Sequence, residues 1–169
     1  AIIGLHKIGA GAVPGTHLLT KKDLVYRFER ASIKAIVATS DGDVTHFADQ
    51  AQLESNTLQC KFVVRGQRDG WIDFDAELEQ ASDEFARVEV SRHDLMLLYF
   101  TSGTTGHPKM VAHDYGYPIA HIVTAKHWQC VDPNGLHLTV AETGWAKAVW
   151  GKLYGQWFLG AGIFVYDFE

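Results

Sequence analysis

The sequence predicts an α/β fold with mostly parallel, doubly wound sheets and helices on their flanks. Short apolar stretches alternate with helical stretches through the first half of the chain, an order that favours parallel strands and right-handed crossovers. One run, residues 95–100, is apolar throughout, which is typical of a strand buried on both faces. The composition agrees, because 47% hydrophobic residues and 16 glycines suit a globular α/β protein with tight turns.

The first third of the chain supplies a helix end, a short strand and a capped helix. Gly9 ends the opening helix, and residues 10–14 form a short apolar strand before a turn at residues 15–16. Thr20 then caps the next helix, and Asp23 stands three residues later, where its acidic side chain can complete a capping box with Thr20. The inner face of that helix consists of Leu24, Val25, Phe28 and Ala31.

A strand–helix–strand unit follows. Residues 35–38 form a buried strand, the turn at residues 41–43 begins a helix, and residues 61–65 form the next strand. Together with residues 10–14, these strands make half of a doubly wound sheet. The inward residues of the intervening helix are Val44, Phe47, Ala48 and Ala51.

The middle of the chain holds the expected boundary between two subdomains. Residues 70–74 lead into an acidic helix or turn at residues 75–80. Residues 82–94 are charged and expected to be exposed, so they form a natural seam. We therefore predict two pieces, about residues 1–90 and residues 91–169.

The second half continues the alternation of strands and helices. Residues 110–113 return as a strand paired with the apolar run before them, and residues 136–141 alternate as a further strand. Residues 116–127 form a helix, and residues 146–158 form another, whose apolar residues recur at three- and four-residue steps. The first of these helices should face inward with Ile119, Ala120, Val123 and His127. The stripe on the second consists of Ala146, Val149, Trp150, Leu153, Tyr154, Trp157 and Phe158, with a packing role expected for the later members.

Charge and cysteine content narrow the class of partner. The net charge is −5 and the pI is about 6.0, so nothing points to nucleic acid or an anionic membrane. The apolar runs are far shorter than a membrane span. Cys60 and Cys130 are isolated and the nine histidines show no metal-ligand spacing, so we expect no metal site among the protein's own residues. Isolated thiols favour a reducing compartment, either the cytoplasm or, in a eukaryote, the mitochondrial matrix.

A loop rich in glycine and hydroxyl residues follows the apolar strand directly. Its glycines permit positive φ and close backbone approach, so successive N–H groups can point at one anion. The hydroxyls add donors, Pro108 stiffens the exit, and Lys109 supplies a compact positive charge. This chemistry suits a polyphosphate, and the simpler alternative is a polar surface turn of the same composition. The loop consists of Thr101, Ser102, Gly103, Thr104, Thr105, Gly106, His107, Pro108 and Lys109.

The spacing of the loop differs from that of the common nucleotide hydrolases. Their motif reads Gly-x-x-x-x-Gly-Lys-Ser/Thr, whereas here only Thr104 and Thr105 separate Gly103 from Gly106, and the lysine comes three positions later. The pattern instead resembles the phosphate-binding signature of the adenylate-forming superfamily. That superfamily includes acyl-CoA synthetases, luciferases and the adenylation domains of peptide synthetases.

A second block resembles one branch of this superfamily. Residues 142–151 read Glu-Thr-Gly-Trp-Ala-Lys-Ala-Val-Trp-Gly and are similar to the acyl-CoA synthetases that act on medium-chain acids, and less closely to acetyl- and propionyl-CoA synthetases. The turn at residues 14–16, followed by Asp23, Tyr26 and Arg27, resembles the same group. The resemblance covers the whole chain but only the middle portion of such an enzyme's large N-terminal AMP-binding domain. We therefore expect a fragment from which the C-terminal domain is absent.

The resemblance implies a two-step reaction. A carboxylate attacks the α-phosphorus of ATP to give an acyl-adenylate and pyrophosphate, and the thiolate of coenzyme A then displaces AMP. The loop would bind the β- and γ-phosphates, with Lys109 and Thr104 as catalytic residues that stabilise the departing pyrophosphate. Mg²⁺ is expected to share that task.

The same resemblance assigns the second block to the carboxylic acid. Trp145, Gly144 and Thr143 correspond to the region that lines the carboxylate and acyl pocket, and Trp145 is the candidate for an aromatic residue that moves between the half-reactions. A buried aromatic at the start of a helix explains Trp145 equally well. His113 is expected to be structural rather than a base, and Lys147 to be solvated.

Two other functions stay open at this point. The chain could be a non-catalytic nucleotide- or phosphate-binding module, or part of an aryl- or amino-acid-adenylating enzyme. The family's adenine, ribose and magnesium motifs would follow residue 169, so we expect the fragment alone to be inactive within an active parent chain. The sequence leaves the identity of the carboxylic acid open, from acetate through octanoate to small aromatic acids. Exposed sheet edges also allow the chain to form a homo-oligomer.

Overall fold

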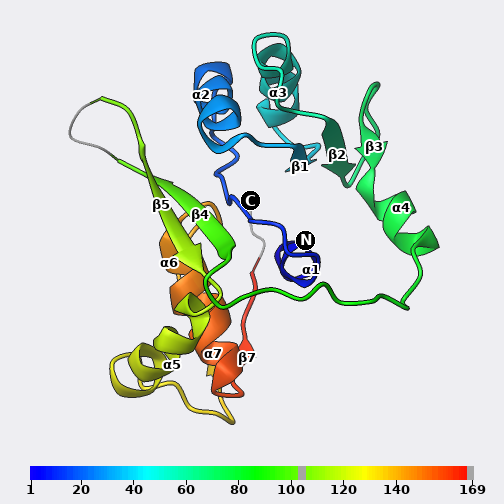
Figure 1. Ribbon diagram of the computed structural model, residues 1–169. Coiled ribbons are helices and arrows are strands. Elements are labelled where there is room, and N and C mark those ends of the chain that lie inside the picture. The colour runs from blue at the N-terminus through cyan, green and yellow to red at the C-terminus, as the bar shows by residue number, and fades with distance from the viewer. Residues whose placement is uncertain (103–105, 167–169) are drawn as a thin grey trace. The chain divides into compact units, whose positions relative to one another are not determined.

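The chain forms two compact units (Figure 1). The computed structural model describes residues 1–102 and 106–166. Residues 17–86 make up one unit, which we call the parallel-sheet unit. Residues 1–16 and 87–169 make up the other, which we call the hairpin unit.

The boundary between the units lies in the segment where the sequence places a seam. The change at residues 86–87 falls within residues 82–94, which are exposed almost throughout. The division into pieces of about 1–90 and 91–169 stays a prediction. The compact units differ from it in one respect, because the first sixteen residues join the later piece.

The parallel-sheet unit is a three-stranded parallel sheet with helices packed against it. Its elements are α2 (Lys21–Ala31), β1 (Ala35–Thr39), α3 (Val44–Gln52), β2 (Cys60–Val64), β3 (Ile72–Asp73) and α4 (Phe74–Gln80). The strands are adjacent in the order β1–β2–β3, so the predicted strand–helix–strand unit is present as β1–α3–β2. α2 and α3 lie together on one side of the sheet (Figure 1), and their buried residues share one apolar core with β1 and β2.

Local sequence signals account for the helices of this unit. The backbone N–H and the hydroxyl of Thr20 both donate to the Asp23 carboxylate, at 3.0 and 2.6 Å, which completes the predicted capping box of α2. Leu24 and Phe28 are buried on the inner face of α2 as predicted. Ala48 is fully buried on α3, where its small side chain lets the helix approach the sheet.

Strand β1 is less buried than the sequence predicts. Ala38 is buried, but Val37 is 41% exposed. The reason is that α2 and α3 cover one face of the sheet, and successive side chains of a strand point to opposite faces. The strand predicted as buried is therefore buried on one face.

The hairpin unit combines an antiparallel hairpin with a set of helices. Its elements are α1 (Ile2–Lys7), β4 (Leu95–Thr101), β5 (Lys109–Asp114), α5 (Tyr117–His127), β6 (Leu136–His137), α6 (Ala146–Ala148), η1 (Val149–Tyr154), α7 (Gly155–Phe158) and β7 (Gly162–Ile163). β4 and β5 pair antiparallel, which confirms the predicted return strand. α5 packs against η1 and α7.

The N-terminal segment belongs to this unit because it pairs with β4. The Ala12 N–H donates to the Met96 carbonyl, and the Leu98 N–H donates to the Ala12 carbonyl, each over 2.9 Å. This single parallel bridge stands where a strand over residues 10–14 is predicted, and it lies beside β4 rather than in the sheet of β1. Pro14 has no N–H to donate, which limits further pairing.

The buried face of α5 differs from the prediction. All four residues predicted to face inward are exposed: Ile119, Ala120, Val123 and His127. The helix instead packs through small groups, because a Cβ on Gly155 of α7 would lie only 2.7 Å from the Cβ of Ala125. Ala125 is fully buried. Because α5 and α7 lie so close together, the small side chain of Ala125 fits between them, whereas the larger side chains of Ile119 and Val123 do not.

The C-terminal helix contains a π-helical segment, η1, that changes its buried face. A π-helix carries extra residues per turn, and each residue turns the helix face by about 100°. Val149 and Tyr154 are buried as predicted, but beyond them Gln156 is fully buried while Trp157 and Phe158 are 51% and 54% exposed. The prediction of a packing role for Trp157 and Phe158 is therefore wrong for their position in this unit.

The strand predicted over residues 136–141 is also shorter in the structure. β6 covers Leu136–His137 and pairs in parallel with β7. Beyond it the Thr139 hydroxyl donates to the Gly151 carbonyl within η1, and the Gln156 Nε2 donates to the same carbonyl at 2.8 Å. These bonds tie the chain to the π-helical segment rather than to a sheet.

Candidate functional site

The predicted phosphate loop connects the two strands of the hairpin. Thr101, the last residue of β4, lies opposite Lys109, the first residue of β5. The two residues that open and close the loop are therefore held next to each other by the sheet. The pairing continues down the hairpin through Tyr99 and Val111.

The stem of the hairpin is firmly buried on the β4 side. Met96, Leu97, Leu98 and Tyr99 are at most 7% exposed, so the centre of the predicted run is buried on both faces, whereas Leu95 at its start is 46% exposed. A loop carried on a rigid, buried strand presents its polar groups from a fixed base. This is the arrangement that a preorganised anion site requires.

The described part of the loop is open to solvent. Its exposed residues are Ser102, Gly106, His107 and Lys109, and its partly buried ones are Thr101 and Pro108. Gly106 has φ +91° and no atom within 4 Å of the position that a Cβ would occupy. Backbone groups here are therefore accessible to a ligand. Gly103, Thr104 and Thr105 lie outside the described residues.

The second candidate block begins α6. Trp145 precedes that helix and is 59% exposed, so the alternative of a buried aromatic does not hold in this unit. Its backbone N–H donates to the Glu142 carbonyl at 3.1 Å, and the Gly144 N–H donates to the Glu142 carboxylate at 3.0 Å. These bonds shape the turn that presents Trp145, and Thr143 beside it is exposed.

Gly144 has a structural reason to be glycine. A Cβ at this position would lie 2.3 Å from the Thr16 nitrogen and 2.5 Å from the Gly15 carbonyl carbon. The backbone of residues 15–16 therefore occupies the space that a side chain would need. A substrate-binding role for Gly144 stays a prediction.

Several aromatic and imidazole rings beside the hairpin were not assigned to the site by sequence reasoning. His113 on β5 lies 3.9 Å from Tyr117 on α5, measured between ring centroids. Tyr117 lies 4.4 Å from His121, and the His121 ring stacks on Trp150 of η1 at 5.9 Å. Tyr117 and His121 are four residues apart, a spacing that places two rings on one helix face, and this signal was available in the sequence.

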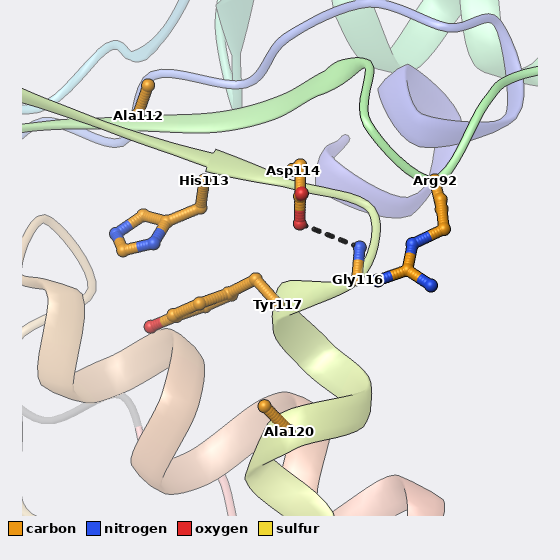
Figure 2. Close-up of a pocket in the computed structure, with 7 residues that line it drawn as sticks. All are labelled: Arg92, Ala112, His113, Asp114, Gly116, Tyr117 and Ala120. Atoms are coloured by element: carbon orange, nitrogen blue, oxygen red, sulfur yellow. Dashed lines mark hydrogen bonds between the residues drawn. The ribbon is translucent and has the colours of Figure 1, made fainter.

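An open pocket of about 510 Å³ lies at the base of the hairpin (Figure 2). The ring of His113 faces that of Tyr117, and the Gly116 N–H donates to the Asp114 carboxylate at 2.9 Å. The pocket is lined by Arg92, Ala112, His113, Asp114, Gly116, Tyr117 and Ala120.

Burial shifts the titration of the rings at this position. The pKa of His113 is lowered by burial, which outweighs the opposite effect of Asp114. Burial and the neighbouring His113 lower the pKa of His121. Burial raises the pKa of Tyr117 to about 12. The lowered pKa values of His113 and His121 favour their neutral imidazole forms, in which His113 packs against Tyr117 tilted at 37° and His121 packs edge-on at 80°.

Comparison with known proteins identifies the family. The family model described as AMP-binding enzyme matches residues 1–168. The chain belongs to this family. The predicted membership of the adenylate-forming superfamily is thus confirmed.

Curated relatives point to one branch of the family. The chain is 35% identical over 162 residues to the mitochondrial acyl-coenzyme A synthetase ACSM4 of Mus musculus, and 37% identical over 163 residues to mouse ACSM5. It is 30% identical over 162 residues to human ACSM3. Each match covers 95% of this chain but 27–28% of the relative. The chain therefore spans a little over a quarter of the length of these relatives.

Two solved structures, of a CoA ligase and of an acyl-CoA synthetase, are similar to this chain in fold. The anthranilate CoA ligase AuaEII, solved with anthranoyl-AMP, has a TM-score of 0.85 at 20% identity over 97% of this chain and 32% of its own. A Brucella canis acyl-CoA synthetase has a TM-score of 0.81 at 23% identity over 96% of this chain and 29% of its own. These likenesses confirm the predicted α/β fold class, with a parallel sheet and flanking helices.

Two properties of the described residues concern membranes and metals. None of the helices found there is both long enough and apolar enough to cross a bilayer. Within residues 1–102 and 106–166, no three His, Cys, Asp or Glu side chains gather in a way that suits a metal ion.

Proposed function

We propose that this chain is the phosphate-binding part of an AMP-forming acyl-CoA synthetase, a fatty acid–CoA ligase for short- or medium-chain acids. The observation that carries the proposal is the loop of residues 101–109, joined to the buried strand β4 at the tip of a hairpin in an AMP-binding enzyme. The names of the curated relatives, all acyl-coenzyme A synthetases, support the reaction class.

The loop acts on the outer phosphates of ATP. When a carboxylate attacks the α-phosphorus, pyrophosphate leaves and its negative charge grows. Donors already in place around the β- and γ-phosphates stabilise that charge without reorganisation. Lys109 supplies the positive charge and Thr104 a hydroxyl, while the backbone around Gly106 permits close approach. The remaining donors come from Thr101, Ser102, Gly103, Thr105 and His107, with Pro108 holding the exit.

The turn before α6 serves the carboxylic acid. Trp145 offers an exposed aromatic surface at the start of a helix, next to Thr143. Gly144 holds the turn against the backbone of residues 15–16. In the second step the thiolate of coenzyme A attacks the acyl carbon and AMP leaves.

Mg²⁺ enters the reaction with ATP. The amide N–H and ammonium groups of the loop bind phosphate oxygens and cannot bind a cation, whereas the hydroxyls of Thr101 and Ser102 can bind either. The described residues of the loop include no carboxylate, so they form no magnesium site of their own, and no step is assigned to the metal here.

The activity belongs to a longer protein in this proposal. The chain spans a little over a quarter of its curated relatives, and the 169 residues alone are expected to be inactive. Release of pyrophosphate by the isolated chain would contradict that expectation. The relatives are named as mitochondrial, which supports a matrix location for a eukaryotic source.

The test is acid-dependent ATP–pyrophosphate exchange by the full-length protein that contains this chain. A panel from acetate to octanoate, with benzoate and amino acids added, separates an acyl-CoA synthetase from an aryl- or amino-acid-adenylating enzyme. Exchange with fatty acids, followed by thioester formation with coenzyme A, is expected. Nucleotide binding without exchange for any acid would favour a non-catalytic module and overturn the proposal.

Replacing Lys109 should separate the two half-reactions. Lys109→Ala removes the positive charge at the leaving pyrophosphate, so adenylation should fall by about 10²–10³-fold. Thioester formation from supplied acyl-adenylate involves no pyrophosphate and should be almost unchanged. Lys147→Ala, which removes an exposed lysine of α6, is the matched control. Equal losses in both steps would count against a phosphate role for Lys109.

A further inference from the structure

Five rings of the hairpin unit make a continuous series of contacts from β4 to η1. The centroid distances are 6.4 Å from Tyr99 to His113, 3.9 Å from His113 to Tyr117, 4.4 Å from Tyr117 to His121 and 5.9 Å from His121 to Trp150. We call these five residues the ring series. Its members come from β4, β5, α5 and η1, so it joins the hairpin to the helices packed beside it.

The ring series starts on the same face of the hairpin as the ends of the phosphate loop. Residues directly opposite each other in an antiparallel pair project to one face, and every second residue returns to that face. Thr101 lies opposite Lys109, and Tyr99 lies opposite Val111. His113 is two residues beyond Val111 on β5. The face that presents Thr101 and Lys109 is therefore the face that His113 and Tyr99 occupy lower down.

We propose that His113 is a positioning residue for the phosphate loop: packed between Tyr99 and Tyr117, its ring fixes the hairpin on α5 and so sets where Lys109 is held. The inference rests on the proposed function, because it assigns a role within the same site. His113 does not touch the phosphates in this account. It lies four positions along β5 from Lys109, about 13 Å, so it acts through the hairpin.

The contacts of His113 explain why a ring is needed at this position. Tyr99 is 2% exposed, so the β4 side of the contact is part of the core. Tyr117 is the first residue of α5, and its ring lies almost against that of His113 (Figure 2). Losing the imidazole would leave a gap between strand and helix, and packed cores respond to such gaps by shifting. Among the described residues, no further strand pairs with β5 to resist that shift.

The first test compares three variants of the full-length protein in ATP–pyrophosphate exchange. His113→Ala should lower kcat/KM for ATP by about 10- to 100-fold, through a higher KM for ATP, with the KM for the acid almost unchanged. His113→Phe keeps a ring in the stack and should restore most of the loss. His127→Ala, an exposed histidine on α5 outside the ring series, should match the wild type. A His113→Ala variant with wild-type kinetics, or no rescue by phenylalanine, would overturn the inference.

A second readout does not depend on activity. Hydrogen–deuterium exchange of the backbone amides of β4 and β5 next to the loop should be faster in His113→Ala than in His127→Ala, and close to wild type in His113→Phe. Equal rates of hydrogen–deuterium exchange in all three variants would overturn the inference, even if the variants were active. If the wild type shows no ATP–pyrophosphate exchange with any acid, the proposed function fails. Hydrogen–deuterium exchange of the β4 and β5 amides then decides alone whether His113 fixes the hairpin on α5.

Discussion

At the residue scale, the candidate site depends on a few positions where chemistry and space coincide. Lys109 is exposed and paired across the hairpin with Thr101, so its ammonium group can reach a ligand above the loop. Gly106 combines positive φ with open space around its Cα. Gly144 is the opposite case, since its Cα faces backbone at close range. One glycine thus serves accessibility and the other serves packing.

Substituting Gly144 should destabilise the hairpin unit. In Gly144→Ala the new Cβ would meet the Thr16 nitrogen at 2.3 Å, and backbone atoms cannot give way as a side chain can. We expect a loss of about 1–3 kcal/mol in the free energy of unfolding, measured by urea denaturation. Gly4→Ala is the control, because nothing lies within 4 Å of its Cβ position in helix α1, and it should be neutral or stabilising. Equal stability of the two variants would contradict the packing around Gly144.

At the element scale, small groups and one π-helical segment decide how the helices of the hairpin unit pack. Gly155 begins α7 directly after η1 and faces α5. The Gly151 carbonyl within η1 accepts hydrogen bonds from the Thr139 hydroxyl and from Gln156. Side-chain donors thus satisfy a backbone group of the widened segment, which lets it persist in a buried position.

The contact between α5 and α7 should not tolerate a methyl group at Gly155. A Cβ there would lie 2.7 Å from the Ala125 Cβ and 2.9 Å from the His121 carbonyl oxygen. Alanine usually stabilises a helix relative to glycine, but here overpacking should win and cost about 1–3 kcal/mol in thermal or urea unfolding. Gly151→Ala is the matched control, since its nearest contacts are at 3.4 Å or more. A Gly155→Ala variant as stable as Gly151→Ala would argue against this helix packing.

In the parallel-sheet unit, one carboxylate joins α3, β2 and the loop between β2 and β3. Asp49 of α3 accepts hydrogen bonds from Lys61 of β2 at 2.7 Å, from Arg68 at 2.7 and 2.9 Å, and from Trp71 at 2.8 Å. Burial raises the pKa of Asp49, but the hydrogen bonds from Lys61, Arg68 and Trp71 lower it by more, so the net shift is downward.

Asp49→Asn should therefore destabilise this unit at neutral pH. The loss should be about 1–3 kcal/mol, because the Lys61 ammonium is left partly buried without its carboxylate. A lowered folded-state pKa gives stability that is fully present above the unfolded-state value of 3.8 and lost as the pH falls through the folded-state value. The difference in free energy of unfolding between Asp49→Asn and wild type, measured by urea denaturation, should shrink as the pH falls through that range. Asp83→Asn, in the exposed segment of residues 82–94, should have the same free energy of unfolding as wild type at every pH. A difference that is independent of pH would contradict the assigned role of Asp49.

At the scale of the whole molecule, the fold class and the phosphate loop of residues 101–109 could be predicted from the sequence. Apolar runs and turn residues predicted β1, α3, β2, β4 and β5, and the order of glycines and lysine in the loop predicted the family, because these signals are local. The capping pair Thr20 and Asp23 was also correct, since three residues suffice to define it.

The errors arise where a distant contact overrides a local pattern. The apolar spacing of Ile119 and Val123 predicts an inner face, but Gly155, far along the chain, draws the Ala125 side of α5 inward. The stripe ending in Trp157 and Phe158 assumes an unbroken helical period, which η1 interrupts. The ring contact between His113 and Tyr117 joins a strand to a helix, and strand and helix periods give no common register from which to predict it.

The central claim is that the loop at the hairpin tip binds the β- and γ-phosphates of ATP. Calorimetric titration of the full-length protein with ATP and with AMP tests this claim most directly. Lys109→Ala should weaken ATP binding by about 10- to 100-fold, because it removes charge-assisted contacts to the β- and γ-phosphates. AMP lacks those phosphates, so its affinity should be the same in variant and wild type. An equal loss of affinity for ATP and AMP, or unchanged affinity for both, would contradict the account.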